Sequence, residues 1–151
     1  MLRDKHIVVI DDTESIRTFL RISLEAHGAT VQTAATAAGG LSLCEQQQPD
    51  LVVLDLGLPD NKGLNILPRL KRLGRAHPLP VLVLTVRKEL DCIERAKELG
   101  ADVYLTKPCF VEDVIEVISQ LLVKRKTPQL ELVVPSPKSD KEDALLTKAT
   151  P

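Results

Sequence analysis

The stretch that most constrains this chain runs from Leu51 to Gly63 and reads LVVLDLGLPDNKG. Its first four residues are all apolar, which is typical of a strand buried on both faces of a parallel sheet. The run ends at a carboxylate, Asp55, and turn signals follow at Pro59-Asp60 and at Gly63. Ligands of open α/β sheets bind at the carboxyl ends of the strands. Asp55 is therefore either a functional group at that edge or an ordinary Asp that begins a turn.

Apolar runs and helical patterns alternate along the rest of the chain. Further strands are expected at 6–10, 30–34, 80–84 and 103–105, and helices at about 16–27, 37–47, 64–75, 88–99 and 111–124. Gly28 and Gly100 are placed to end two of the helices, and Pro68 predicts a late start or a kink in a third. Five strands alternating with five helices predict an α/β fold, a doubly wound parallel sheet with right-handed crossovers.

The C-terminal stretch differs in composition from what precedes it. Residues 125–151 contain four prolines and the polar run 136–143, so we expect one domain over 1–124 followed by a flexible tail or linker. The alternative for residues 130–134 (LELVV) is a short edge strand.

Composition excludes several classes of function. The net charge is −1, so no broad electrostatic attraction to nucleic acid is expected, and aromatic residues make up only 2% of the chain, too few for base-stacking platforms. No apolar run is long enough to span a membrane, and HIVVI (6–10) is too short for the apolar core of a signal peptide. The three cysteines are widely spaced, which fits neither a disulfide framework nor a zinc site. A reduced, cytoplasmic protein is therefore expected.

Polar residues stand at the ends of four of the predicted strands. Because the carboxyl ends of parallel strands share one edge of the sheet, these side chains are expected to lie together. Three carboxylates at one place repel one another and raise one another's pKa values, so a cation has to balance them. A lysine supplies one charge, and Mg²⁺, which prefers oxygen ligands, supplies the rest. The alternative is a solvated rim of charges. The residues concerned are Asp11, Asp12, Asp55, Thr85 and Lys107.

These residues sit in four motifs: IDD at 10–12, LDLGLPDNKG at 54–63, LT at 84–85 and GADVYLTKP at 100–108. Over residues 5 to about 124 the chain thereby resembles the receiver domain of bacterial two-component response regulators. The resemblance implies a flavodoxin-like sheet of order 2-1-3-4-5. It also implies a signalling protein, not an enzyme in the ordinary sense, which assists its own phosphorylation and dephosphorylation.

The resemblance assigns roles to the acids. Asp55 is the implied phosphoacceptor, taking its phosphoryl group from a sensor histidine kinase or a phosphotransfer protein. Asp12, Asp55 and the backbone carbonyl of Gly57 are the implied Mg²⁺ ligands, with Asp11 acting mainly through water.

Further roles follow for the last two strands. Lys107 is expected to contact the phosphoryl group and to precede a cis peptide bond to Pro108. Thr85 and Tyr104 match the switch pair, although an ordinary core position is the alternative for Tyr104. A charge-assisted hydrogen bond from Thr85 contributes roughly 1.5–3 kcal/mol, whereas a full switch needs about 5.5 kcal/mol, so Lys107 and repacking of Tyr104 are expected to supply the remainder. Val86, where the family usually has Ala or Gly, is predicted to narrow access to the pocket.

Partners and alternatives follow from the same resemblance. Phosphorylation is expected to switch the surface of strand 103–105 and its flanking helices, where Val111, Val114, Ile115 and Ile118 lie, toward a downstream protein or an output domain. Direct binding of nucleic acid or membrane is not expected. A phosphorylation-dependent dimer stays open, although 114–122 lacks the basic residue that such dimers use. The alternative function is a pseudo-receiver that binds proteins without being phosphorylated. A phosphatase with an Asp nucleophile is disfavoured because the first strand lacks acid-x-acid spacing.

Overall fold

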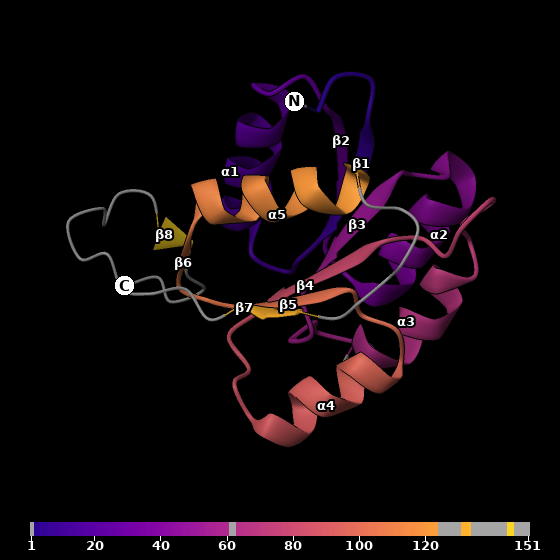
Figure 1. Cartoon of the computed structure of the whole chain (residues 1–151), viewed down its shortest axis with the longest axis vertical. Helices are drawn as coiled ribbons and strands as arrows, with labels where there is room; N and C mark the ends of the chain where they lie inside the picture. Colours follow the sequence, from indigo (N-terminus) through magenta and orange to yellow (C-terminus); the bar gives the residue numbers. More distant parts are fainter. Residues whose placement is uncertain (1, 61–62, 124–130, 134–144, 147–151) are drawn as a thin grey trace.

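A single parallel sheet forms the centre of the computed structural model, which describes residues 2–60, 63–123, 131–133 and 145–146. Its strands adjoin in the order β2-β1-β3-β4-β5-β7, so the predicted order 2-1-3-4-5 is confirmed and a sixth strand is added (Figure 1). In that spatial order the strands are β2 (Thr30–Ala34), β1 (His6–Ile10), β3 (Leu51–Leu54), β4 (Val81–Thr85), β5 (Val103–Thr106) and β7 (Glu131–Val133).

Five helices cover the two faces of the sheet. They are α1 (Glu14–Glu25), α2 (Ala37–Gln47), α3 (Gly63–Lys71), α4 (Leu90–Glu98) and α5 (Val111–Val123). Buried side chains of α1 and α5 pack on one face, and those of α2, α3 and α4 pack on the other (Figure 1). Alternate residues of β1 serve the two cores, because Ile7 and Val9 face α1 whereas Val8 and Ile10 face α2. The four strands β1, β3, β4 and β5 are therefore largely buried on both sides, as their apolar sequences require, whereas the edge strand β2 is partly exposed.

Helix boundaries follow local chemistry. Gly28 and Gly100 have φ angles of +99° and +111°, as expected for glycines that end helices. Of the two outcomes that Pro68 predicted, a late start of α3 is wrong, since this helix begins at Gly63 and contains Pro68, and a kink stays a prediction. It ends at Lys71, earlier than predicted, because the next turn tightens and at Gly74 the backbone approaches His77 too closely for any side chain.

Part of the C-terminal stretch is strand. Glu131–Val133 pairs in parallel with β5, which matches the edge-strand alternative for LELVV. A second, unexpected sheet joins β6 (Cys109–Phe110) to β8 (Leu145–Leu146) in antiparallel fashion. The remainder of 124–151 lies outside the described residues, so the domain boundary stays a prediction. Among the helices described, none has the length and apolarity needed to cross a membrane.

Candidate functional site

An acidic pocket lies where β1 and β3 end. These two strands pair in register, so Asp11, which follows β1, and Asp55, which follows β3, leave the sheet side by side. Oxygen atoms of Asp11, Asp12 and Asp55 all lie within 4.8 Å of one another. The side chains of Asp11 and Asp55 are buried, whereas Asp12 is exposed at the rim. The three acids that the sequence singled out thus form one cluster.

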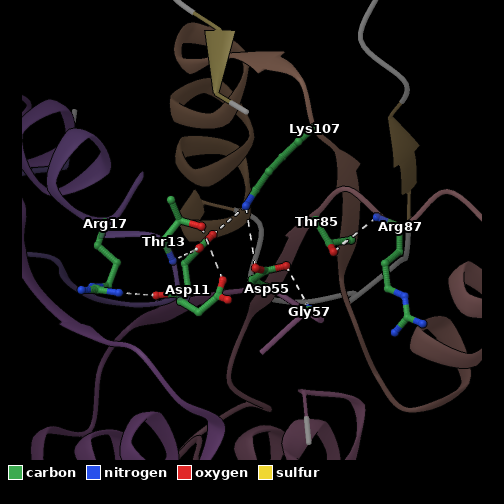
Figure 2. A network of polar contacts seen from close by, with 9 residues as sticks. Asp11, Thr13, Arg17, Asp55, Gly57, Thr85, Arg87 and Lys107 are labelled. Carbon is green, nitrogen blue, oxygen red and sulfur yellow. Dashed lines mark hydrogen bonds and ion pairs between the residues drawn. The ribbon is translucent and has the colours of Figure 1, made fainter. Parts of the chain in front are cut away.

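Lys107 enters this pocket from the end of β5. Its Nζ lies 2.7 Å from Oδ2 of Asp11 and 3.8 Å from Oδ2 of Asp55, and its side chain is fully buried (Figure 2). The peptide bond from Lys107 to Pro108 is cis, the isomer that the resemblance implied. The ammonium of Lys107 therefore contacts two of the three carboxylates at this edge of the sheet.

Burial and the neighbouring charges of the pocket change the pKa of Asp11. Burial raises the pKa of Asp11, and the nearby charge of Asp55 raises it further, whereas Lys107 opposes both effects. Burial is the largest of these effects, so the pKa of Asp11 stays raised although Lys107 lowers it. The donor set consists of carboxylate oxygens with one acid open to solvent, which suits a hard cation such as Mg²⁺ that retains part of its water. The residues present therefore fit this ion.

Backbone donors fix the two buried carboxylates. The Thr13 N–H donates to Oδ1 of Asp11 at 2.9 Å, and the Gly57 N–H donates to Oδ1 of Asp55 at 3.1 Å (Figure 2). Arg17 of α1, which the sequence reasoning missed, donates from Nη1 to the backbone carbonyl of Asp11 at 2.8 Å. These bonds leave Oδ2 of both buried acids directed toward Lys107. The loops after β1 and β3 are thus held in fixed geometry around the pocket.

Thr85 and Tyr104 are linked through the backbone of Arg87. The Arg87 N–H donates to Oγ1 of Thr85 at 3.4 Å, and the Tyr104 hydroxyl donates to the Arg87 carbonyl at 2.8 Å. Both side chains are fully buried, and burial raises the pKa of Tyr104. The Tyr104 hydroxyl also lies 3.6 Å from Sγ of Cys92 on α4. Hydrogen bonds therefore connect Thr85 with Tyr104 and α4 in this structure.

The structure divides the remaining predicted residues between surface and core. Val86, which follows Thr85, is 40% exposed. Of the residues named for the partner surface, Val114 and Ile118 belong to the core, while Val111 and Ile115 pack against it with partial exposure. The two core residues are therefore unavailable to a partner in this structure.

One contact near the site was not anticipated. Asp60, interpreted from the sequence only as a turn former, accepts hydrogen bonds from the Ala37 and Ala38 N–H groups, each at 3.1 Å. The sequence did contain a signal for this contact. Helix α2 begins with Ala37-Ala38-Gly39-Gly40 and has no acidic residue in its first turn, so its N-terminus favours a negative charge from another segment.

Comparison with known proteins agrees with this geometry. The family model described as "Response regulator receiver domain" matches residues 7–119. The chain is 38% identical over 134 residues to the transcriptional regulatory protein KdpE of Mycobacterium tuberculosis, covering 89% of this chain but only 58% of that relative.

Solved structures show the same fold. A CheY-like receiver domain protein from Methanospirillum hungatei is 30% identical with a TM-score of 0.76, over 81% of this chain and 96% of that one. A response regulator from Burkholderia pseudomallei, solved with a phosphorylated aspartic acid, calcium ion and citrate, is 30% identical with a TM-score of 0.71, over 80% of this chain and 70% of that one. The chain belongs to the receiver domain family of two-component response regulators.

Proposed function

We propose that Asp55 accepts a phosphoryl group from the phosphohistidine of a sensor kinase or phosphotransfer protein. The observation that carries this proposal is the buried Asp55 carboxylate, held by the Gly57 N–H, 3.8 Å from Lys107 and clustered with two further acids. In the transfer, an oxygen of Asp55 forms a bond to phosphorus as the phosphorus–nitrogen bond of the donor breaks. The released histidine keeps the electron pair and takes up a proton from solvent.

Lys107 balances charge during this step. Its ammonium already lies between the carboxylates of Asp11 and Asp55, so it needs little movement to contact a phosphoryl group on Asp55. Because Lys107 is fully buried, its charge acts in a medium of low dielectric and is screened little by water. Catalysis here is positioning together with electrostatic stabilisation.

Mg²⁺ is the cofactor that this donor set favours. Receiver domains generally bind Mg²⁺, and we assign Asp12, Asp55 and the Gly57 carbonyl as ligands, with Asp11 acting mainly through water. The bound ion would stabilise negative charge on the transferred phosphoryl oxygens. Asp12 is exposed to solvent, so an ion held there would keep part of its water, whereas buried Asp11 accepts from Lys107 and from the Thr13 N–H.

The switch then passes through Thr85, Arg87 and Tyr104. A phosphoryl group on Asp55 would accept a hydrogen bond from the Thr85 hydroxyl. Movement of this side chain toward the phosphoryl group would weaken the bond that Thr85 accepts from the Arg87 N–H, and so loosen the segment whose carbonyl accepts from Tyr104. The surface that changes is that of β4, β5 and α5, and its reader is a downstream protein or an output domain. A cytoplasmic location completes the proposal, and a phosphorylation-dependent dimer stays open.

The test is stoichiometric phosphorylation of the full chain. With acetyl phosphate and Mg²⁺, the wild type should gain one phosphoryl group by intact mass, and Asp55→Asn should gain none. Lys107→Met should be phosphorylated more slowly. A wild type that acquires no phosphoryl group and binds no beryllofluoride in the presence of Mg²⁺ would favour the alternative, a pseudo-receiver that acts as a protein-binding module.

A further inference from the structure

The loop between β3 and α3 carries both Asp55 and Gly57. Its first part is anchored in the core, because Leu56 and Leu58 are buried. Its far end is anchored by close packing at Gly63, where a Cβ would lie 2.9 Å from the Leu56 Cα and 3.0 Å from the Asp55 carbonyl oxygen. Between these two anchors, the loop contacts the N-terminus of helix α2.

That contact is made by Asp60. Its two carboxylate oxygens accept from the Ala37 and Ala38 N–H groups, each at 3.1 Å. These are the first two residues of α2, whose N–H groups have no partner within the helix. Asp60 is three residues from Gly57, a span of at most about 11 Å. A loop fastened at Asp60 therefore has little freedom at Gly57.

The helix depends on this contact as much as the loop does. The first turn of α2 contains no acidic residue, so Asp60 supplies from another element the negative charge that a helix N-terminus favours. Gly39 and Gly40 weaken the helix in that same turn. Gly40 is needed because a side chain there would collide with Ile10. The start of α2 is thus weak by composition and held from outside.

We propose that Asp60 is a positioning residue for the metal site, which it couples to the N-terminus of α2. This inference rests on the proposed function. By holding the loop against α2, Asp60 keeps the Gly57 backbone and Asp55 in the arrangement that receives Mg²⁺. Coupling between two sites is reciprocal. If the contact between Asp60 and α2 raises the affinity for Mg²⁺ by a given factor, binding of Mg²⁺ raises the equilibrium constant for forming that contact by the same factor.

Thr36 provides a matched control. Its hydroxyl accepts from the Gly39 N–H at 3.0 Å and caps the same helix, but this bond stays within the start of α2. Thr36→Ala and Asp60→Ala therefore both weaken the N-terminus of α2, whereas only Asp60→Ala releases the loop of the site. A purely structural role predicts the same behaviour toward Mg²⁺ for the two variants.

The experiment measures Mg²⁺ affinity by calorimetry on the unphosphorylated full chain. Asp60→Ala should raise the dissociation constant about tenfold, the size expected when a group that orients a metal ligand is lost. Asp60→Asn, which keeps one acceptor oxygen, should fall between Asp60→Ala and wild type. Thr36→Ala should stay within about twofold of wild type even though its thermal midpoint falls.

Hydrogen exchange supplies a second measurement that needs no variant. Addition of Mg²⁺ to wild type should slow exchange at the Ala37 and Ala38 amides more than at the Gly39 amide. Wild-type affinity in Asp60→Ala, or equal protection of the three amides, would overturn the positioning role and leave the proposed function standing. A wild type that binds no Mg²⁺ would instead overturn the proposed function, and this inference with it.

Discussion

Lys107 lies closer to Asp11 than to Asp55, at 2.7 Å against 3.8 Å, although the proposed phosphoryl group is on Asp55. Before phosphorylation, the buried ammonium is therefore bonded chiefly to the acid whose pKa burial raises. A phosphoryl group on Asp55 would carry more negative charge than the Asp55 carboxylate and would attract Lys107 away from Asp11. Part of the interaction energy between Lys107 and the phosphoryl group would then offset the loss of the contact with Asp11.

Asp11→Asn should remove a pH dependence from the stability of the metal-free protein. The pKa of Asp11 is higher in the folded protein than its value of 3.8 in the unfolded chain. Asp11 therefore contributes to stability at pH values below 3.8, and this contribution is lost as the pH rises through the pKa of the folded protein. An asparagine removes the charge and keeps one acceptor oxygen, whereas Asp11 accepts from both the Thr13 N–H and Lys107. In urea unfolding at a series of pH values, the free energy of unfolding of wild type should fall relative to that of Asp11→Asn as the pH rises above about 4. A constant difference would contradict the prediction, and saturating Mg²⁺ should reduce it.

Thr85→Ala should leave the switch incomplete. Its hydrogen bond to the phosphoryl group contributes roughly 1.5–3 kcal/mol of the about 5.5 kcal/mol needed. Tyr104 is the only tyrosine in the chain, so its NMR signals report the switch without ambiguity. With beryllofluoride bound, Thr85→Ala should show a mixture of two Tyr104 environments, whereas Thr30→Ala, at the exposed start of β2, should behave as wild type. Complete switching in Thr85→Ala would disprove the assignment.

Val86→Ala should shorten the lifetime of the phosphoryl group. Val86 adjoins Thr85, and its β-branched side chain is predicted to restrict the approach of water and of small phosphodonors. The measurement is loss of label after removal of the donor, together with the rate of phosphorylation by acetyl phosphate. Val123→Ala, at an 82% exposed residue at the end of α5, is the control. An unchanged half-life in Val86→Ala would remove the access role.

The three cysteines should differ sharply in reactivity. Burial raises the pKa of Cys44 and of Cys109 to about 12, so almost no thiolate is present at pH 8. Cys92 on α4 is only half-buried. In a titration with a disulfide reagent, one thiol should react with the native protein and all three after denaturation. Cys92→Ser should abolish the native reaction, and two fast thiols in wild type would contradict the prediction.

Asp102→Ala should destabilise the fold strongly. Oδ2 of Asp102 accepts from Nζ of Lys71 at 2.5 Å and from the Val81 N–H at 2.8 Å, and both charged side chains are largely buried. Loss of the carboxylate leaves a buried ammonium and a buried N–H, which should lower the free energy of unfolding by about 3 kcal/mol. Glu98→Ala breaks the exposed pair with Arg95 and should change it by under about 1 kcal/mol. Similar losses in the two variants would refute this ranking.

The sequence was sufficient to predict the sheet and the meeting of Asp11, Asp12, Asp55 and Lys107 at one edge of it. Asp11, Asp55, Thr85 and Lys107 each lie at or just after the end of a strand, and a parallel sheet brings such ends to one edge whatever the loops do. Local pattern alone therefore indicated which side chains would meet.

Contacts between distant segments were not predictable in the same way. Asp60 meets α2 across 22 or 23 residues, and Lys71 meets Asp102 across 31. Nothing in the local pattern of either residue specifies its partner, because each contact depends on how helices lie on the sheet. The end of α3 was missed for a similar reason, since the close approach of backbone at Gly74 is set by tertiary packing.

The strand Glu131–Val133 has a practical consequence. By pairing with β5, this strand covers one edge of the sheet. The unpaired backbone N–H and C=O groups of an uncovered edge strand can pair with strands of other molecules. A shortened protein that ends at residue 124, the expected end of the receiver domain, would lack this strand and would leave the edge of β5 exposed. Laboratories expressing the receiver unit alone should therefore extend it beyond residue 133 to limit self-association.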